Sequence, residues 1–100
     1  MVLAVRCHAR FRMAFINGER VVHRNLSLAS VSIGNPLIAK VGNFATARHL
    51  DSSGAYRELD GADTINFKWA APEILVDTVF SVASDVWSYG ICLWEVATQG

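Results

Sequence analysis

The stretch Val22-His23-Arg24-Asn25-Leu26 marks the point where an apolar pair of residues gives way to a polar loop, His23 to Ser30. Two short runs suited to β-structure follow this loop, at residues 31–33 and 37–41. Gly34-Asn35-Pro36 lies between them and has the composition of a turn. The sequence therefore predicts a β-hairpin directly after the polar loop.

A helix is expected on the N-terminal side of this loop. Apolar residues recur at three- and four-residue steps over residues 2–17. Gly18 is expected to end this helix as its left-handed cap. On the other side, periodicity fades from Asn43 to Glu73, and a connection of this length is typical of a functional or mobile loop. Residues 72–75 are expected to start a short helix.

The last predicted helix runs from about Asp85 to Thr98, with Ser84 as its N-cap. Apolar side chains lie nearly all round it, which favours a buried central helix over a surface helix. These side chains are those of Val86, Trp87, Tyr89, Ile91, Leu93, Trp94 and Val96.

Composition narrows the class of protein. The chain has 100 residues, of which 52% are hydrophobic and 18% are charged, with a formal net charge of zero. These values indicate a single globular domain and give no reason to expect a nucleic-acid partner. No apolar stretch approaches the roughly 20 residues of a membrane span. Cys7 and Cys92 lie in apolar runs and are expected to be buried free thiols.

Four motifs lie in order along roughly residues 5–100: Val22 to Leu26, Asn43-Phe44-Ala45, Lys68 to Glu73 and Ser84 to Gly90. Their order and spacing resemble the HRD, DFG, APE and DxWSxG elements of the protein kinase family. Lys68-Trp69 and the ending Ser88 to Glu95 resemble the tyrosine-kinase version, whereas Asn66 and Ala29 depart from it.

This resemblance implies an α+β fold, mainly α, that forms part of a kinase C-terminal lobe. Its parts would be a catalytic loop, a small β-hairpin, an activation segment and a central apolar helix. Residues 1–100 would form one partial kinase domain, without the N-terminal lobe and the last helices of the C-terminal lobe.

The resemblance also assigns positions to the chemistry of the site. Asn25 stands where the family has its catalytic aspartate, and Asn43 where it has the aspartate that binds magnesium. Ser30 replaces the catalytic-loop asparagine, and Ser32 takes the position that contacts adenine. An amide cannot act as a general base, and magnesium prefers anionic oxygens. Kinases use ATP and magnesium, but for this chain we expect no cofactor.

Other matching positions are architectural or regulatory in the family. His23 and Phe44 match members of the stacked regulatory spine, and Asp85 matches the residue that anchors it, although a helix-start acid is an alternative reading of Asp85. Arg24 matches the arginine that pairs with a phosphorylated activation loop. Tyr56 lies where that phosphate is often carried, but an exposed loop tyrosine is the alternative. Glu73 would pair with an arginine of a later helix.

We therefore expect a tyrosine-kinase-like pseudokinase that is catalytically impaired and acts through protein binding. Its partners would be other proteins, such as kinases or signalling adaptors, and not nucleic acid. It would be cytoplasmic or on the cytoplasmic side of a membrane-bound parent. Two alternatives stay open: a fragment of an active ATP-dependent protein tyrosine kinase, and a gene fragment without function.

Overall fold

The computed structural model describes residues 10–33, 39–42, 44–58 and 67–99. Helices hold more of these residues than strands do, and the strands are short and pair antiparallel, so the fold is α+β and mainly helical, as predicted. The elements are α2 (Arg10–Gly18), β1 (Val21–Val22), η2 (Leu28–Ser30), β2 (Val31–Ile33), β3 (Ala39–Val41), η3 (Phe44–Thr46), β4 (Arg48–His49), β5 (Ala55–Arg57), η4 (Phe67–Trp69), α3 (Pro72–Asp77), β6 (Val79–Ser81) and α4 (Val82–Gln99).

Within these ranges the strands form three separate antiparallel pairs. The pair β2–β3, with Val31 opposite Val41, confirms the predicted hairpin. Its predicted turn and residues 37–38 lie outside the described residues. The pairs β1–β4 and β5–β6 join segments that are distant in the sequence. Both lie partly in the region 43–73, where the sequence shows no periodicity.

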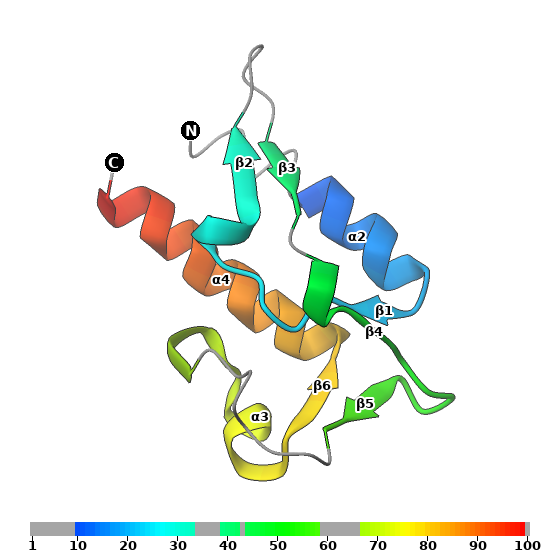
Figure 1. The fold of residues 1–100 in the computed structure, drawn as a ribbon. Coiled ribbons are helices and arrows are strands. Elements are labelled where there is room, and N and C mark those ends of the chain that lie inside the picture. The colour runs from blue at the N-terminus through cyan, green and yellow to red at the C-terminus, as the bar shows by residue number, and fades with distance from the viewer. Residues whose placement is uncertain (1–9, 34–38, 43, 59–66, 100) are drawn as a thin grey trace.

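Helix α4 crosses the middle of the molecule (Figure 1), with the β2–β3 hairpin on one side and α3 with β5–β6 on the other. Cys92 and Val96 form one buried cluster, to which the hairpin contributes Val31 and Val41. The second cluster joins β1, α3 and β6 through Val22, Ala71, Ile74 and Phe80. Burying a side chain such as Phe80 stabilises the fold by about 1.5–3 kcal/mol.

Cys92 is a buried free thiol, as predicted, and burial raises its pKa to about 11. Cys7 lies outside the described residues. Within the described part of the chain, no helix is long and apolar enough to cross a membrane.

Two details of α4 correct the prediction. The helix begins at Val82, three residues earlier than expected, so Ser84 lies inside it and is not its N-cap. The Ser84 hydroxyl instead accepts a hydrogen bond from the Ser81 amide (2.9 Å) and donates one to the Ser81 carbonyl (2.8 Å). The helix is also not buried all round, because Trp94 is 63% exposed and Val86 60%.

The end of α2 also differs from the prediction. Gly18 is the last residue of the helix and does not have a left-handed backbone. Arg20 takes that conformation two residues later, with a φ of 62°. Its carbonyl accepts the Leu50 amide at 2.8 Å, and its guanidinium donates to the Asp51 carbonyl. These bonds to a distant segment hold Arg20 in a conformation that arginine otherwise rarely adopts.

Candidate functional site

Asp85, in the first turn of α4, fixes the backbone of the polar loop. Its Oδ2 accepts the His23 amide at 2.8 Å, and its Oδ1 accepts the Arg24 amide at 3.3 Å. Asn17 of α2 donates its side-chain amide to Oδ2 at 3.2 Å. The carboxyl is 2% exposed, and burial raises its pKa even though these hydrogen bonds act in the opposite direction. One side chain therefore holds the loop on α4.

His23 fastens the same loop to the end of the hairpin. Its Nδ1 accepts the Asn25 amide at 3.2 Å, so the ring proton is on Nε2, which donates to the Gly42 carbonyl at 2.8 Å. The fully buried ring meets the Phe44 ring edge-on, with centroids 5.2 Å apart. The predicted neighbours His23, Phe44 and Asp85 therefore lie together.

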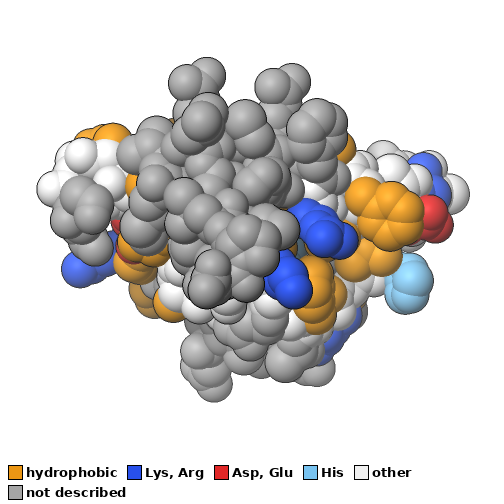
Figure 2. All heavy atoms as spheres, turned by 90° about the horizontal axis from the view of Figure 1, so that it is seen from above, with side chains coloured by type: hydrophobic (Ala, Val, Ile, Leu, Met, Phe, Trp, Pro, Cys, Tyr) orange, Lys and Arg blue, Asp and Glu red, His pale blue; other side chains and the backbone are white. Residues whose placement is uncertain are grey.

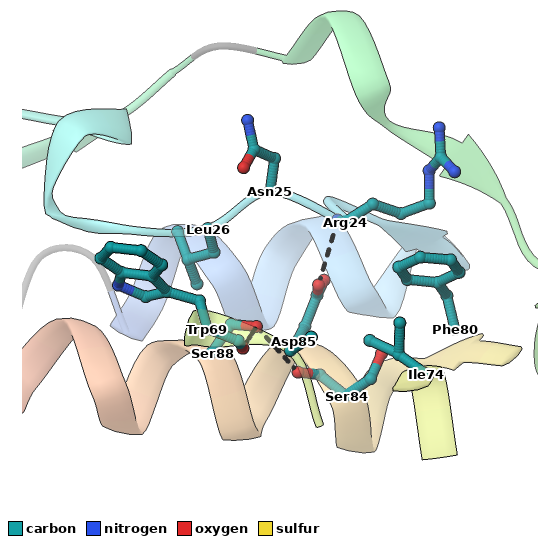
Figure 3. A pocket seen from close by; sticks show the side chains of 10 residues that line it. Arg24, Asn25, Leu26, Trp69, Ile74, Phe80, Ser84, Asp85 and Ser88 are labelled. Atoms are coloured by element: carbon teal, nitrogen blue, oxygen red, sulfur yellow. Dashed lines mark hydrogen bonds between the residues drawn. The ribbon is translucent and has the colours of Figure 1, made fainter. Parts of the chain in front are cut away.

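Asn25 and Ser30, at the two predicted catalytic positions, are joined directly. The Ser30 hydroxyl donates to the Asn25 carbonyl at 2.8 Å, and Ser30 is 3% exposed. The Asn25 side chain points away from α4, whereas Asp85 reaches up to the loop from below (Figure 3). The cavity between them measures about 10 Å³, which is the space of about one water molecule.

Arg24 has a left-handed backbone, with a φ of 73°, and its side chain extends from the polar loop. Its Nε donates to the Thr46 carbonyl at 2.6 Å, and its terminal nitrogen forms a 2.9 Å ion pair with Glu58. The guanidinium carbon lies 5.1 Å from the ring centroids of both Tyr56 and Phe80. Arg24 thereby joins the loop to β5, β6 and the segment that connects them to the hairpin.

The remaining predicted residues are distributed as follows. Tyr56 is a half-buried residue of strand β5, which contradicts the alternative of an exposed loop tyrosine. Ser32 is exposed in β2, and Glu73 is exposed in the first turn of α3, so neither lies in the buried network around Asp85. Asn43, the predicted metal position, lies outside the described residues.

The oxygens around the loop do not fit magnesium. The carboxylate of Asp85 is engaged by three N–H donors, and that of Glu58 by Arg24. The positions that the resemblance assigns to magnesium carry the neutral side chains of Asn43 and Ser30, and the catalytic-base position carries the neutral amide of Asn25. No group of three or more His, Cys, Asp or Glu residues able to hold a metal occurs among residues 10–33, 39–42, 44–58 and 67–99. Magnesium favours anionic oxygen ligands.

Sequence reasoning missed two acidic residues of this network. Glu58 lies two residues after Tyr56 in an extended segment, and that spacing places both side chains on one face. This spacing is a sequence signal from which the proximity of Tyr56 and Glu58 could have been predicted. Glu95 of α4 accepts the Trp69 indole N–H at 2.6 Å and the Leu28 amide at 3.0 Å, joining η4 and η2. No local pattern indicates a contact across 67 residues.

The surface beside the site carries both basic and hydrophobic side chains. On the face seen in Figure 2, basic and hydrophobic side chains lie side by side. A groove of about 380 Å³ is lined from α2 and β3 by Arg12, Phe15, Lys40 and Val41, and by Phe44.

Comparison with known proteins shows which family this chain is similar to. The family model described as protein tyrosine and serine/threonine kinase matches residues 4–100. The chain is 39% identical over 88 residues to the macrophage colony-stimulating factor 1 receptor of Mus musculus. It is 37% identical over 86 residues to the insulin-like growth factor 1 receptor of Bos taurus, and 34% over 99 residues to the high affinity nerve growth factor receptor of Rattus norvegicus.

These matches cover 88%, 86% and 99% of this chain. They cover only 9%, 13% and 12% of the respective relatives. The likeness is therefore to a small part of each receptor.

Proposed function

Because this chain belongs to the protein tyrosine and serine/threonine kinase family, we propose that it is a tyrosine-kinase-like scaffold that binds other proteins and transfers little or no phosphate. The observation that carries this proposal is that the negative charges around the loop are engaged in holding the fold together. The two carboxylates described there, Asp85 and Glu58, both hold protein groups in place. At the position where the family has its catalytic base, this chain has the amide side chain of Asn25.

The loss of that base has a predictable kinetic cost. The Asn25 amide can orient a hydroxyl by hydrogen bonding, but it cannot take the proton. General-base assistance contributes typically ~10²–10⁴ in rate. Ser30 is buried, and its hydroxyl is bonded to the Asn25 carbonyl, so it is poorly placed to replace a metal-binding amide. The ATP and magnesium chemistry of the family therefore has little support from these side chains.

Binding to other proteins has support from the surface. Several large hydrophobic residues of α3 and α4 are exposed: Leu75, Val76, Val86, Trp87 and Trp94. Side chains of this kind are available for contact with another protein, and apolar surface is what protein–protein contacts remove from water.

A phosphotransfer assay with radiolabelled ATP, magnesium and a generic tyrosine-containing polymer tests the proposal. We expect no transfer above the level of a heat-denatured sample, and no magnesium- and ATP-dependent rise in melting temperature. Transfer at the ~1–100 s⁻¹ typical of kinases would overturn the scaffold proposal and favour the enzymatic alternative.

The variant Asn25→Asp with Asn43→Asp refines that assay, because it restores both carboxylates. A gain in transfer in the double variant would attribute the missing activity to these two positions. If the unaltered chain is inactive and the double variant is too, the substitutions at Ser30 and Ser32 become the next ones to reverse.

A further inference from the structure

The groove of about 380 Å³ lies between α2 and β3, which are neighbours in the structure (Figure 1). Two of its aromatic side chains are largely uncovered, since Phe15 is 69% exposed and Phe44 is 44% exposed. Removing such surface from water is favourable. The groove is lined by Arg12, Phe15, Ile16, Lys40, Val41 and Phe44.

The core beneath the groove holds its β3 side in place. Val41 packs against the buried cluster on α4. The Gly42 amide donates to the Ser30 carbonyl at 2.8 Å. The Phe44 ring meets the buried His23 ring edge-on, with centroids 5.2 Å apart. A surface that is already ordered loses less conformational entropy when a partner binds to it.

Both sides of the groove carry a positive charge. Arg12 belongs to α2 and Lys40 to β3, and both side chains are exposed. No carboxylate of the described residues lines the groove, and the one ion pair within 4.0 Å among those residues joins Arg24 to Glu58 instead. The whole chain has a formal net charge of zero, so the positive charge is a local feature of this groove.

Two cations beside an apolar floor suit a protein segment better than a polyanion. Nucleic acids and anionic membranes are bound by larger clusters of cations. A small inorganic anion would leave Phe15 and Phe44 in contact with water. An amphipathic segment instead carries apolar side chains on one face and charged side chains beside them, so it can satisfy both parts of the groove.

We propose that the groove between α2 and β3 docks an acidic amphipathic segment of another protein. Apolar side chains of the segment cover Phe15, Val41 and Phe44, and its carboxylates pair with Arg12 and Lys40. This inference rests on the proposed protein-binding function and gives it a second surface with a partner of defined chemistry.

A matched set of synthetic peptides tests the charge of the partner. Each peptide is an amphipathic helix of about 14 residues, or roughly four turns, with leucine on one face and glutamate, glutamine or lysine on the other. We expect the unaltered chain to bind the glutamate peptide about tenfold tighter than the glutamine peptide, and the lysine peptide most weakly. High salt should reduce this preference. Fluorescence anisotropy measures each Kd.

Charge reversal tests the location of the site. In Arg12→Glu with Lys40→Glu the order of the peptides should invert, so that the lysine peptide binds at least about fivefold tighter than the glutamate peptide. The control Arg57→Glu with Lys68→Glu makes the same change in net charge at two exposed positions outside the groove. It should keep the original order.

The apolar floor has a separate test. Phe15→Gln should weaken the binding of all three peptides by about five- to tenfold. The control Phe67→Gln removes a ring that is 62% exposed in η4, and it should leave each Kd within about twofold. Equal effects of the two substitutions would contradict docking in the groove.

Several results would overturn the proposal. They are equal affinity of the unaltered chain for the glutamate and glutamine peptides, an unchanged order after charge reversal, and equally tight binding of single-stranded DNA or phosphatidylserine vesicles through the same two cations. A dimer that charge reversal abolishes would make a second copy of the chain the occupant, and would overturn it too.

The proposal stays testable if the charge-reversed variant does not fold, because the peptide comparison on the unaltered chain and Phe15→Gln then decide it. The groove shares no lining residue with the cavity beside Trp94 on α4. Failure here therefore removes this docking surface alone, whereas the phosphotransfer assay decides the proposed scaffold function.

Discussion

At the scale of the residue, Asp85 shows how a buried carboxylate can organise a loop. Its two oxygens accept hydrogen bonds from three N–H donors. The side chain of Asp85→Asn has only one oxygen, and its NH₂ group would face one or more of these donors. We expect this variant to lose about 1–3 kcal/mol of unfolding free energy at pH 7. Chemical denaturation of both proteins measures the loss, with Asp77→Asn as the exposed control. Equal stability at pH 7 would contradict the anchoring role.

The pH dependence of this loss has a definite sign. Burial raises the pKa of Asp85 above its usual 3.8, so the folded chain holds the proton more tightly than the unfolded chain. The stability that the carboxyl contributes is thus greatest below pH 3.8 and falls as the pH rises through the folded-state pKa. The variant Asp85→Asn lacks this titration. The difference in unfolding free energy between the unaltered chain and the variant should therefore be smaller at neutral pH than in acid. Asp51, whose pKa is lowered by hydrogen bonds from Ser53 and Ala55, cancels because both proteins retain it.

At the scale of the element, local pattern predicted some parts of the fold and could not predict others. The β2–β3 hairpin and α3 carry their turn residues and Pro72 in the sequence itself. Strands β4 and β5 are only two and three residues long, and they exist because partners far along the chain, such as Phe80 opposite Tyr56, complete their hydrogen bonds. The motif positions could be read from spacing, but the contacts of Glu58 and Glu95 required the folded chain.

Glu95 gives a prediction at this scale because it connects three elements through one oxygen. Its Oε1 accepts both the Trp69 indole and the Leu28 amide. Glu95→Ala leaves both donors without this acceptor and should cost about 2–4 kcal/mol, whereas Glu95→Gln keeps an oxygen there and should cost less than about 1.5 kcal/mol. Urea unfolding followed by tryptophan fluorescence measures both values. Equal losses in the two variants would show that charge, and not the acceptor geometry, joins η2 and η4 to α4.

At the scale of the whole molecule, α4 is the element that both halves share, and one side of it remains uncovered in the described structure. Its inner face buries Cys92 and Val96, while Trp94 and Val86 are largely exposed. A cavity of about 470 Å³ lies beside Trp94, lined by Lys68, Trp69, Ile91 and Glu95. Exposed apolar surface of this kind promotes association in water, because contact removes it from the solvent.

We therefore expect the isolated chain to self-associate as its concentration rises, and Trp94→Gln to weaken that association. The substitution should change the unfolding free energy by less than about 1 kcal/mol, since this indole is 63% exposed and contributes little to the core. Sedimentation velocity over a concentration series measures the association. Ala97→Gln is the matched control, because it adds the same polar side chain at another exposed position of α4 and retains the indole. If Trp94→Gln and Ala97→Gln sediment alike, the exposed tryptophan does not drive contact, and the protein-binding part of the proposed function loses its main structural support.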